Sequence, residues 1–220
     1  APPRTPLSGP HRVPGRGDRE LPGAVGATKA WGSRPQIVRN GHRLMRYMDD
    51  APADFVRHAS ERELAGLDAF VHRTFRGSDA RDFVRALRRL DTCYGGLGGF
   101  FESRYAATGD LPAVLADFRR EFFEAEHAPR CEKHLSSIER GAACKRLCMY
   151  LRWMVRRDDR GVDFGLWPRI PVSALRLPPD LPLRPTAPAR RLPPRRPTQL
   201  PAVSRLPARP RPCRARYPAR

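Results

Sequence analysis

The stretch of sequence that decides the fold is Gly141-Ala-Ala-Cys-Lys-Arg-Leu-Cys-Met-Tyr-Leu-Arg-Trp-Met-Val-Arg-Arg157. Apolar side chains recur in this stretch every three or four residues. They are Leu147, Tyr150, Leu151 and Met154. This spacing matches the 3.6 residues of a helical turn and puts these side chains on one side of a helix. The stretch therefore predicts a long amphipathic helix whose apolar side faces a core.

Signals for the starts of helices occur at several points upstream. Ser33 is a favourable N-cap, and Pro35 fits the first turn of the helix that follows it. Ser60 and Glu63 have the spacing of a capping box, in which side chain and backbone hydrogen-bond reciprocally. Ser78 is expected to cap a further helix. Because no segment alternates polar and apolar residues convincingly, we predict an all-α fold.

Composition divides the chain into three parts. Residues 1–19 are rich in Pro and Gly and are expected to be disordered. Residues 20–177 carry the apolar periodicity and are predicted to form a single all-α domain. Residues 178–220 form a tail rich in Arg and Pro, which we expect to be disordered because Pro removes backbone donors. The window 171–220 holds 12 arginines and one acid, Asp180, and so contributes +11 of the formal net charge of +19.

The composition also bears on location and partners. No apolar run approaches the roughly 20 residues that a membrane-spanning helix needs, and the N-terminal residues lack the apolar core of a signal peptide. Five cysteines, an odd number, do not suit a secreted fold held by disulfides. We therefore expect a cytoplasmic protein with no membrane association. We also expect a monomer without a cofactor.

Two blocks of the sequence resemble the signature of a bacterial family that has no assigned activity. Residues 141–167 are similar to the family's S-A-C-K-R-L-N-M-F-L-R-W-M-V-R followed by V-D-F-G-x-W. Residues 20–34 are similar to its E-I-A-G-x-x-A-A-x-x-A-W-G-N-R. The resemblance covers about residues 20–180, and it implies common ancestry more than it implies a function.

A more distant resemblance concerns helix-hairpin-helix DNA glycosylases with lyase activity. In those enzymes a lysine begins a helix after a Gly-containing hairpin, and an aspartate follows further along the chain. Gly141, Lys145 and Asp180 have this layout in the present sequence. The resemblance implies a helix-hairpin-helix-like fold with DNA as the partner. It further implies that Lys145 forms a Schiff base with the sugar C1′ of a damaged nucleotide and that Asp180 assists.

A non-catalytic nucleic-acid-binding module is the second interpretation. In this interpretation Lys145 and nearby arginines only hold phosphate groups. The candidate phosphate-binding arginines are Arg146, Arg152, Arg156 and Arg157. The acids that follow them are Asp158, Asp159 and Asp163. These acids are expected to cap the next turn or to pair with the arginines, and a Mg²⁺ site is a further alternative.

The tail admits three interpretations. Asp180 lies in Pro-Pro-Asp-Leu-Pro, where the family signature reads P-L-D-T-H, so Pro182 replaces the histidine. We hypothesise that the reading frame shifts between about Leu177 and Leu183, because out-of-frame GC-rich codons give mostly Pro, Arg and Ala. The product would then be truncated and inactive. The other interpretations are a native basic tail that binds nucleic acid and a set of PxxP ligand motifs such as residues 182–185.

Two pairs of metal-ligating residue types occur near the strongest predicted helix. They are Cys131 with His134, and Cys144 with Cys148. Four N and S ligands of this kind could close a tetrahedral zinc site. Buried thiols that pack as small apolar side chains are the simpler interpretation, and we predict no metal site.

Overall fold

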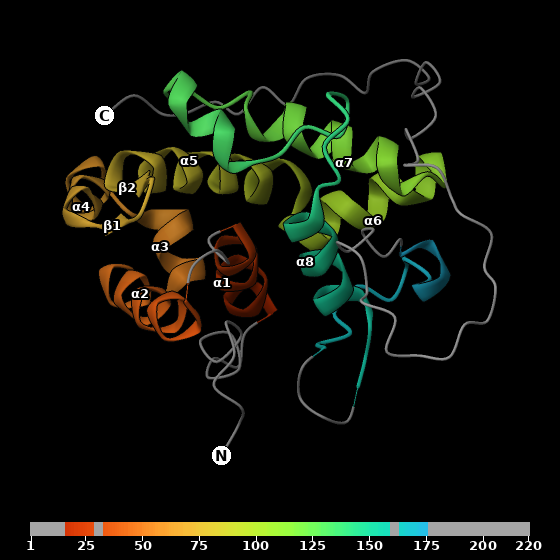
Figure 1. Cartoon of the computed structure of the whole chain (residues 1–220), viewed down its shortest axis with the longest axis horizontal. Helices are drawn as coiled ribbons and strands as arrows, with labels where there is room; N and C mark the ends of the chain where they lie inside the picture. Colours follow the sequence, from red (N-terminus) through yellow and green to blue (C-terminus); the bar gives the residue numbers. More distant parts are fainter. Residues whose placement is uncertain (1–15, 29–32, 159–162, 176–220) are drawn as a thin grey trace.

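The computed structural model describes residues 16–28, 33–158 and 163–175, and Figure 1 shows how their helices pack together. The first part of the chain contains α1 (Arg16–Thr28), α2 (Arg34–Tyr47), α3 (Pro52–His58), α4 (Glu61–Gly66), η2 (Leu67–Ala69), β1 (Val71–His72), β2 (Phe75–Arg76) and α5 (Gly77–Tyr94). The second part contains α6 (Leu97–Thr108), α7 (Leu111–Phe122), η3 (Pro129–His134), α8 (Lys145–Val155) and η4 (Val172–Ala174).

The predicted helical fold is confirmed. Among the described residues, extended structure is limited to the antiparallel pair β1 and β2 and to one isolated bridge. Ser33 is the N-cap of α2, although its side chain makes no capping hydrogen bond. Ser60 and Glu63 form the predicted capping box at the start of α4. Helix α1 begins at Arg16, inside the segment 1–19 that was expected to be disordered.

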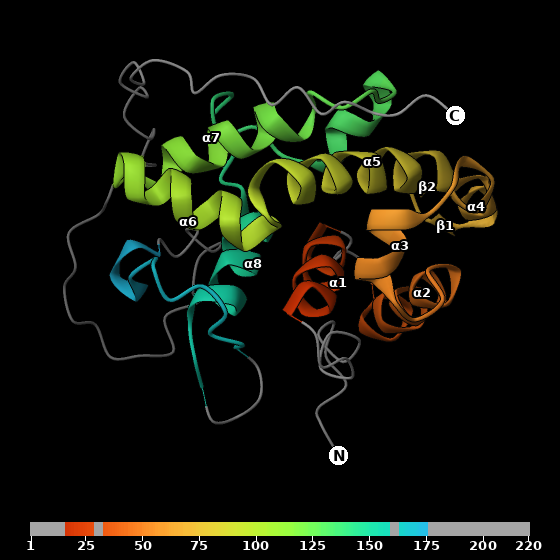
Figure 2. The same ribbon diagram turned by 180° about the vertical axis from the view of Figure 1, so that it is seen from behind.

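Helix α1 lies against α8 and α3 in the middle of the fold (Figures 1 and 2). Leu21 and Val25 of α1 are buried. Gly23 lets α8 come close, since a Cβ at position 23 would lie 2.8 Å from Met154 Cε and 3.2 Å from Tyr150 Cε2. The two sequence blocks that carry the family resemblance therefore pack directly on each other.

Helix α5 also contributes to the core, and its buried apolar residues include Phe83, Val84, Leu87 and Leu90. The prediction that Ser78 caps this helix is wrong. The helix begins at Gly77, and Asp79 accepts a hydrogen bond of 2.8 Å from the backbone N–H of Arg76. An acid in the first turn can reach back to the N-cap N–H, which makes a serine cap unnecessary.

Aromatic side chains of α6 and α7 extend the core toward the segment that follows α8. Phe101 stacks on Trp167 with a centroid distance of 5.0 Å and an interplanar angle of 21°. Phe118 packs on Phe101 at 4.8 Å. Each such pair contributes about 0.5–1.5 kcal/mol beyond the burial of apolar area. These contacts fix the chain after α8 against α6.

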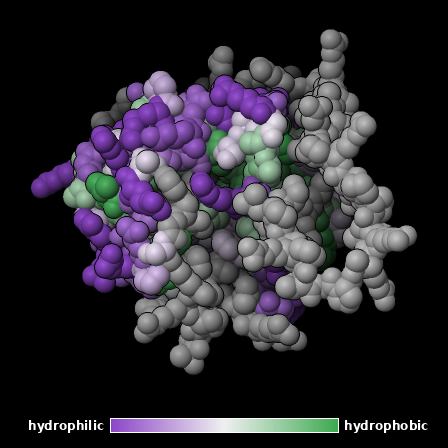
Figure 3. All heavy atoms as spheres, viewed as in Figure 1, coloured by the Kyte–Doolittle hydropathy of each residue, from purple (hydrophilic) through white to green (hydrophobic). Residues whose placement is uncertain are grey.

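The surface of the described residues is mostly polar over the part of the molecule that contains α2 to α5 (Figure 3). Among the residues that the structure describes, two large apolar side chains are more than half exposed, Val71 in β1 and Val172 in η4. In the described ranges, every helix is too short or too polar to traverse a bilayer.

Gly77→Ala is expected to lower the free energy of unfolding by about 2 kcal/mol, because it overpacks a backbone contact. A Cβ at position 77 would lie 2.1 Å from Leu67 O and 2.4 Å from Asp68 Cα, so the backbone of η2 would have to move. Gly41→Ala in α2 is the matched control, since a Cβ there meets nothing within 4 Å. The control is expected to gain up to about 1 kcal/mol from helix propensity. Urea unfolding measures both, and equal losses would contradict the prediction.

Candidate nucleic-acid interface

The turn before α8 determines where Lys145 lies. The N–H of Gly141 donates to Ile138 O at 3.0 Å, and the N–H of Ala142 donates to Ser137 O at 3.1 Å. Gly141 has a φ of +79°, a left-handed conformation that glycine adopts without strain. A tight turn therefore leads into α8, whose first residue is Lys145.

The predicted start of this helix at Gly141 is wrong, because α8 begins at Lys145. Cys144 has a φ of +47°, which a helical residue cannot have, so the helix does not extend upstream through it. The Cys144 thiol is buried and donates to Ser136 O at 3.5 Å, which anchors this conformation. Lys145 consequently lies in the first helical turn, the position that the glycosylase resemblance implies.

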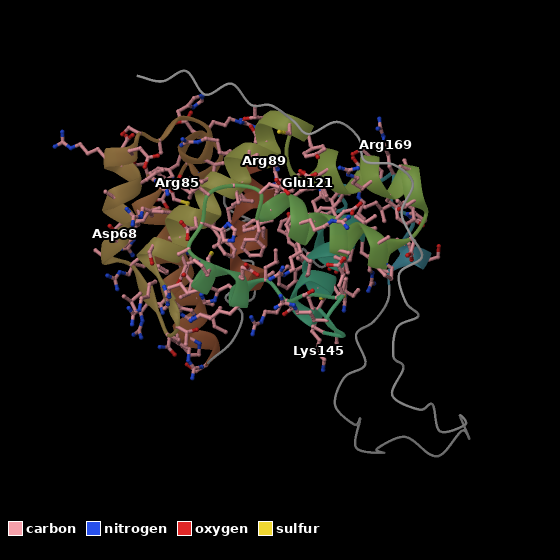
Figure 4. All side chains as sticks on the ribbon, turned by 90° about the horizontal axis from the view of Figure 1, so that it is seen from above. Asp68, Arg85, Arg89, Glu121, Lys145 and Arg169 are labelled. Carbon is pink, nitrogen blue, oxygen red and sulfur yellow. The ribbon has the colours of Figure 1, made fainter. Side chains whose placement is uncertain are left out.

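Helix α8 has a buried side and an outer side. The buried side consists of Tyr150, Leu151, Trp153, Met154 and Val155. Arg152 and Arg156, the C-cap residue of α8, follow Lys145 by seven and eleven residues, about two and three helical turns. Each of these two side chains therefore starts within about 20° of that of Lys145 around the helix axis. They lie on the side opposite the core, and Figure 4 shows Lys145 at the rim of the molecule. We call this row of Lys145, Arg152 and Arg156 the outer row of α8.

Arg146 turns away from the outer row into a pocket between α1, α5, α7 and α8. Most of the pocket wall is apolar, with Phe83, Phe118 and Phe122 among its members, and His134 and Arg146 supply polar atoms. Partial burial lowers the pKa of the Arg146 guanidinium from its usual value. The cavity has a volume of about 30 Å³, which is room for only one or two water-sized groups next to His134 and Arg146.

A buried acid orients His134 at this pocket. Asp79 Oδ2 lies 3.2 Å from His134 Nε2 and 2.9 Å from Arg130 Nη1. The Asp79 side chain is fully buried, so these contacts tie α5 to η3 without water between them. Burial lowers the pKa of His134, and the Asp79 carboxylate acts in the opposite direction.

The stability of the fold is expected to fall as the pH decreases from about 7.5 to about 5.5, and His134 is expected to contribute to that fall. Its folded pKa lies below the ordinary value of 6.5. In this range the unfolded chain therefore binds more protons at this residue than the folded chain does. The stabilising contribution is present above pH 6.5 and is lost as the pH drops toward the folded pKa.

Urea unfolding at the two pH values measures this effect. His134→Gln is expected to show a smaller pH dependence than the unsubstituted chain. His58→Gln, a change at an exposed histidine of α3, is the matched control. An unchanged pH dependence in His134→Gln would contradict the prediction.

Arg152 and Arg156 share one buried carboxylate. Asp163 Oδ2 lies 3.7 Å from Arg152 Nε and 3.5 Å from Arg156 Nε. The Asp163 side chain is fully buried; burial raises its pKa, and the two guanidinium groups act in the opposite direction. The predicted pairing between the α8 arginines and the acids that follow is therefore confirmed for Asp163.

The four arginines that the sequence singles out do not form one stripe. Arg146 lines the pocket, and Arg157 lies beyond α8 in an isolated β-bridge. Arg152 and Arg156 remain on the side of Lys145. A phosphate backbone that runs along α8 would meet the outer row and not Arg146.

Two of the predicted residues lie outside the described residues, Asp180 and Asp159. The approach of Asp180 to Lys145 therefore stays a prediction. The same holds for the Arg- and Pro-rich tail, residues 178–220, and for its three interpretations.

The four candidate zinc ligands do not converge. Within the ranges that the structure describes, no group of three or more His, Cys, Asp or Glu side chains could hold a metal ion. These residues therefore give no support to the Mg²⁺ alternative either. Cys131 and Cys144 are buried free thiols. Burial raises the pKa of Cys144 to about 11 and also raises the pKa of Cys131, so both remain protonated at neutral pH.

Sequence reasoning missed the role of Glu20. Its Oε1 accepts a hydrogen bond of 2.8 Å from Trp167 Nε1, and its Oε2 accepts one of 3.2 Å from the N–H of Gly98 in the first turn of α6. Its backbone oxygen accepts a hydrogen bond of 3.1 Å from the Tyr150 hydroxyl. Glu20 is 4% exposed. It joins α1, α6, α8 and the segment after α8, and its carboxylate is stabilised by the positive end of the α6 dipole.

The fold and these contacts define a helical protein in which α1, α6 and α8 are joined through a buried glutamate, with a basic outer row on α8. A family model described as "Protein of unknown function (DUF2400)" matches residues 5–220, and the chain belongs to this family. No curated protein and no solved structure matches the chain. The resemblance to DNA glycosylases receives no support from these comparisons.

Proposed function

We propose that the chain binds a nucleic-acid strand along the outer row of α8 and is a DNA N-glycosylase/lyase that uses Lys145 as its reacting amine. One observation carries this proposal: the lysine that opens α8 shares its side of the helix with Arg152 and Arg156. The two arginines follow Lys145 by about 10 and 16 Å along the helix axis. Positive side chains in such a row bind phosphate groups by neutralising their charge.

The reaction requires a neutral amine at the sugar C1′ of the damaged nucleotide. The Nζ lone pair of Lys145 attacks C1′ and forms a new N–C1′ bond. The bond from C1′ to the base breaks at the same time, and the base leaves with the electron pair of that broken bond and takes up a proton. Nζ then loses a proton as the C1′–O4′ bond breaks, which gives a C1′=N Schiff base and a protonated O4′. At an existing abasic aldehyde the same amine condenses with loss of water. Asp180 stays the candidate for moving these protons.

Trapping with sodium borohydride tests this reaction, because borohydride reduces the Schiff base to a stable amine that links protein and DNA. The chain is expected to form a covalent adduct with a duplex that contains an abasic site. Lys145→Ala is expected to abolish the adduct. Lys133→Ala, which removes an exposed lysine of η3, is the matched control and should retain it. No adduct from the unsubstituted chain, or an adduct that survives Lys145→Ala, would overturn the proposed reaction.

A non-catalytic nucleic-acid-binding module is the second candidate. The observation that favours it is the partly exposed pair Arg152 and Arg156, which can hold phosphate without any reacting amine. Binding of the same duplex without a borohydride adduct assigns the chain to this class.

A further inference from the structure

Arg152 and Arg156 form ion pairs, but no hydrogen bonds, with the buried carboxylate of Asp163. Each Nε faces Asp163 Oδ2, and neither side chain forms another ion pair or side-chain hydrogen bond with a described residue. The two side chains are 35% and 41% exposed. A guanidinium carries five N–H donors, so the Nη donors remain for a group from outside.

The two positive charges are held close together. Both Nε atoms lie within 4 Å of the same oxygen, so they are at most about 7 Å apart. Like charges at this separation repel each other, and the single negative charge of Asp163 offsets this repulsion only in part. A second anion, bound from solvent, would offset it further.

Asp163 has an unusual environment for a buried carboxylate. Its side chain is fully buried, and neither oxygen has a hydrogen-bond partner among the described residues. Buried carboxylates are usually hydrogen-bonded, because an unsatisfied oxygen is costly. A positioning role explains these contacts: Asp163 faces the Nε edges of two guanidinium groups, so that their Nη edges face outward.

We propose that Arg152 and Arg156 form a phosphate-binding site in which Asp163 is a positioning residue. The planar Nη edge of a guanidinium matches two phosphate oxygens at once, which a lysine cannot do. The nearby Asp158 accepts a hydrogen bond of 3.4 Å from the backbone N–H of Asp163. In identifying the phosphate as that of a nucleic-acid backbone, this inference rests on the proposed function.

Binding of a fluorescent duplex at several salt concentrations tests the site. The duplex carries a tetrahydrofuran abasic analogue, which has no aldehyde and cannot react with Lys145. Arg152→Gln and Arg156→Gln are each expected to weaken binding about three- to tenfold and to reduce the slope of log Kd against log salt by about 1. Arg62→Gln, an exposed arginine of α4, is the matched control and should leave both quantities unchanged.

Asp163→Asn separates positioning from charge. Removal of an acid beside a phosphate site should tighten binding if charge alone matters, whereas loss of positioning weakens it. We expect weakening by about threefold or more, while Asp54→Asn, the same change at an exposed acid of α3, does not weaken binding. Arg152→Lys keeps the charge but loses the planar edge, and it is expected to weaken binding even if Asp163→Asn does not fold. Tighter binding in Asp163→Asn, or unchanged binding in Arg152→Lys, overturns the positioning role.

A second ligand, inorganic phosphate, shows whether the phosphate-binding site or the proposed function is wrong. Duplex binding that is unchanged in both glutamine variants overturns the site and leaves the proposed function to the borohydride experiment. If the duplex does not bind but inorganic phosphate raises the melting temperature, and this rise needs Arg152 and Arg156, the site stands and the proposed function fails. If neither ligand has an effect, both are overturned.

Discussion

Glu20→Ala is expected to lower the free energy of unfolding by about 4 kcal/mol, because it leaves two donors without their acceptor in the core. These donors are the Trp167 indole N–H and the backbone N–H of Gly98, at 2.8 and 3.2 Å from the carboxylate. Each buried donor that loses its partner costs about 1–3 kcal/mol, and α6 also loses an anion at its N-terminus. Urea unfolding at neutral pH measures the loss.

A double-mutant cycle with Trp167→Phe identifies the source of this effect. Phenylalanine removes the indole N–H but keeps an aromatic ring next to Phe101, on which Trp167 stacks. In the Trp167→Phe background, Glu20→Ala is expected to cost about 1–2 kcal/mol less than in the unsubstituted chain. Strictly additive losses would show that the Glu20–Trp167 hydrogen bond does not stabilise the fold.

Asp79→Ala is expected to lower the free energy of unfolding by about 3 kcal/mol. The fully buried carboxylate accepts hydrogen bonds from Arg130, His134 and the backbone N–H of Arg76. Removal of one partner from a buried pair costs about 3–5 kcal/mol, and the lower end applies because the Arg130 side chain is 35% exposed and can reach water.

Asp79→Asn is the control for this prediction. Asparagine keeps an oxygen for the N–H of Arg76 but removes the charge that faces Arg130 and His134. It is expected to cost about half as much as the alanine variant. Losses below about 1 kcal/mol in both variants would mean that these contacts are not formed in solution.

Local signals in the sequence predict several of the helices, namely α2, α4, α5 and α8. The capping box of Ser60 and Glu63 works within four residues, so it can be recognised without knowledge of the fold. The apolar spacing of Tyr150, Leu151 and Met154 correctly predicts the buried side of α8. The helix start at Lys145 is missed, because the left-handed conformation of Cys144 depends on a thiol contact that no local pattern reveals.

Contacts between segments that are far apart in the sequence cannot be predicted from local patterns. Glu20 meets Gly98 and Trp167 across 78 and 147 residues, and an acid before an apolar run does not reveal such partners. The pair of Asp79 and His134 spans 55 residues and is hidden for the same reason. These residues form the polar framework of the core, which depends on tertiary packing.

The candidate site is predicted in part. The sequence predicts that Lys145 lies near the beginning of a helix and that arginines follow it, since both are local features. The separation of Arg146 from the outer row depends on which side of α8 meets α1 and α7, and this is decided by packing. The convergence of Arg152 and Arg156 on Asp163 depends on the return of the chain after α8.

The central claim is that Lys145 supplies the reacting amine, and the most direct measurement is the position of the reduced adduct in the chain. The protein has three lysines, Lys29, Lys133 and Lys145. After borohydride trapping and digestion by nuclease and trypsin, tandem mass spectrometry should find the sugar-derived mass on Lys145. The modified peptide should span residues 141–146, because trypsin does not cut after an alkylated lysine. A mass on Lys29, Lys133 or the N-terminal amine, or no modified peptide at all, would contradict the claim.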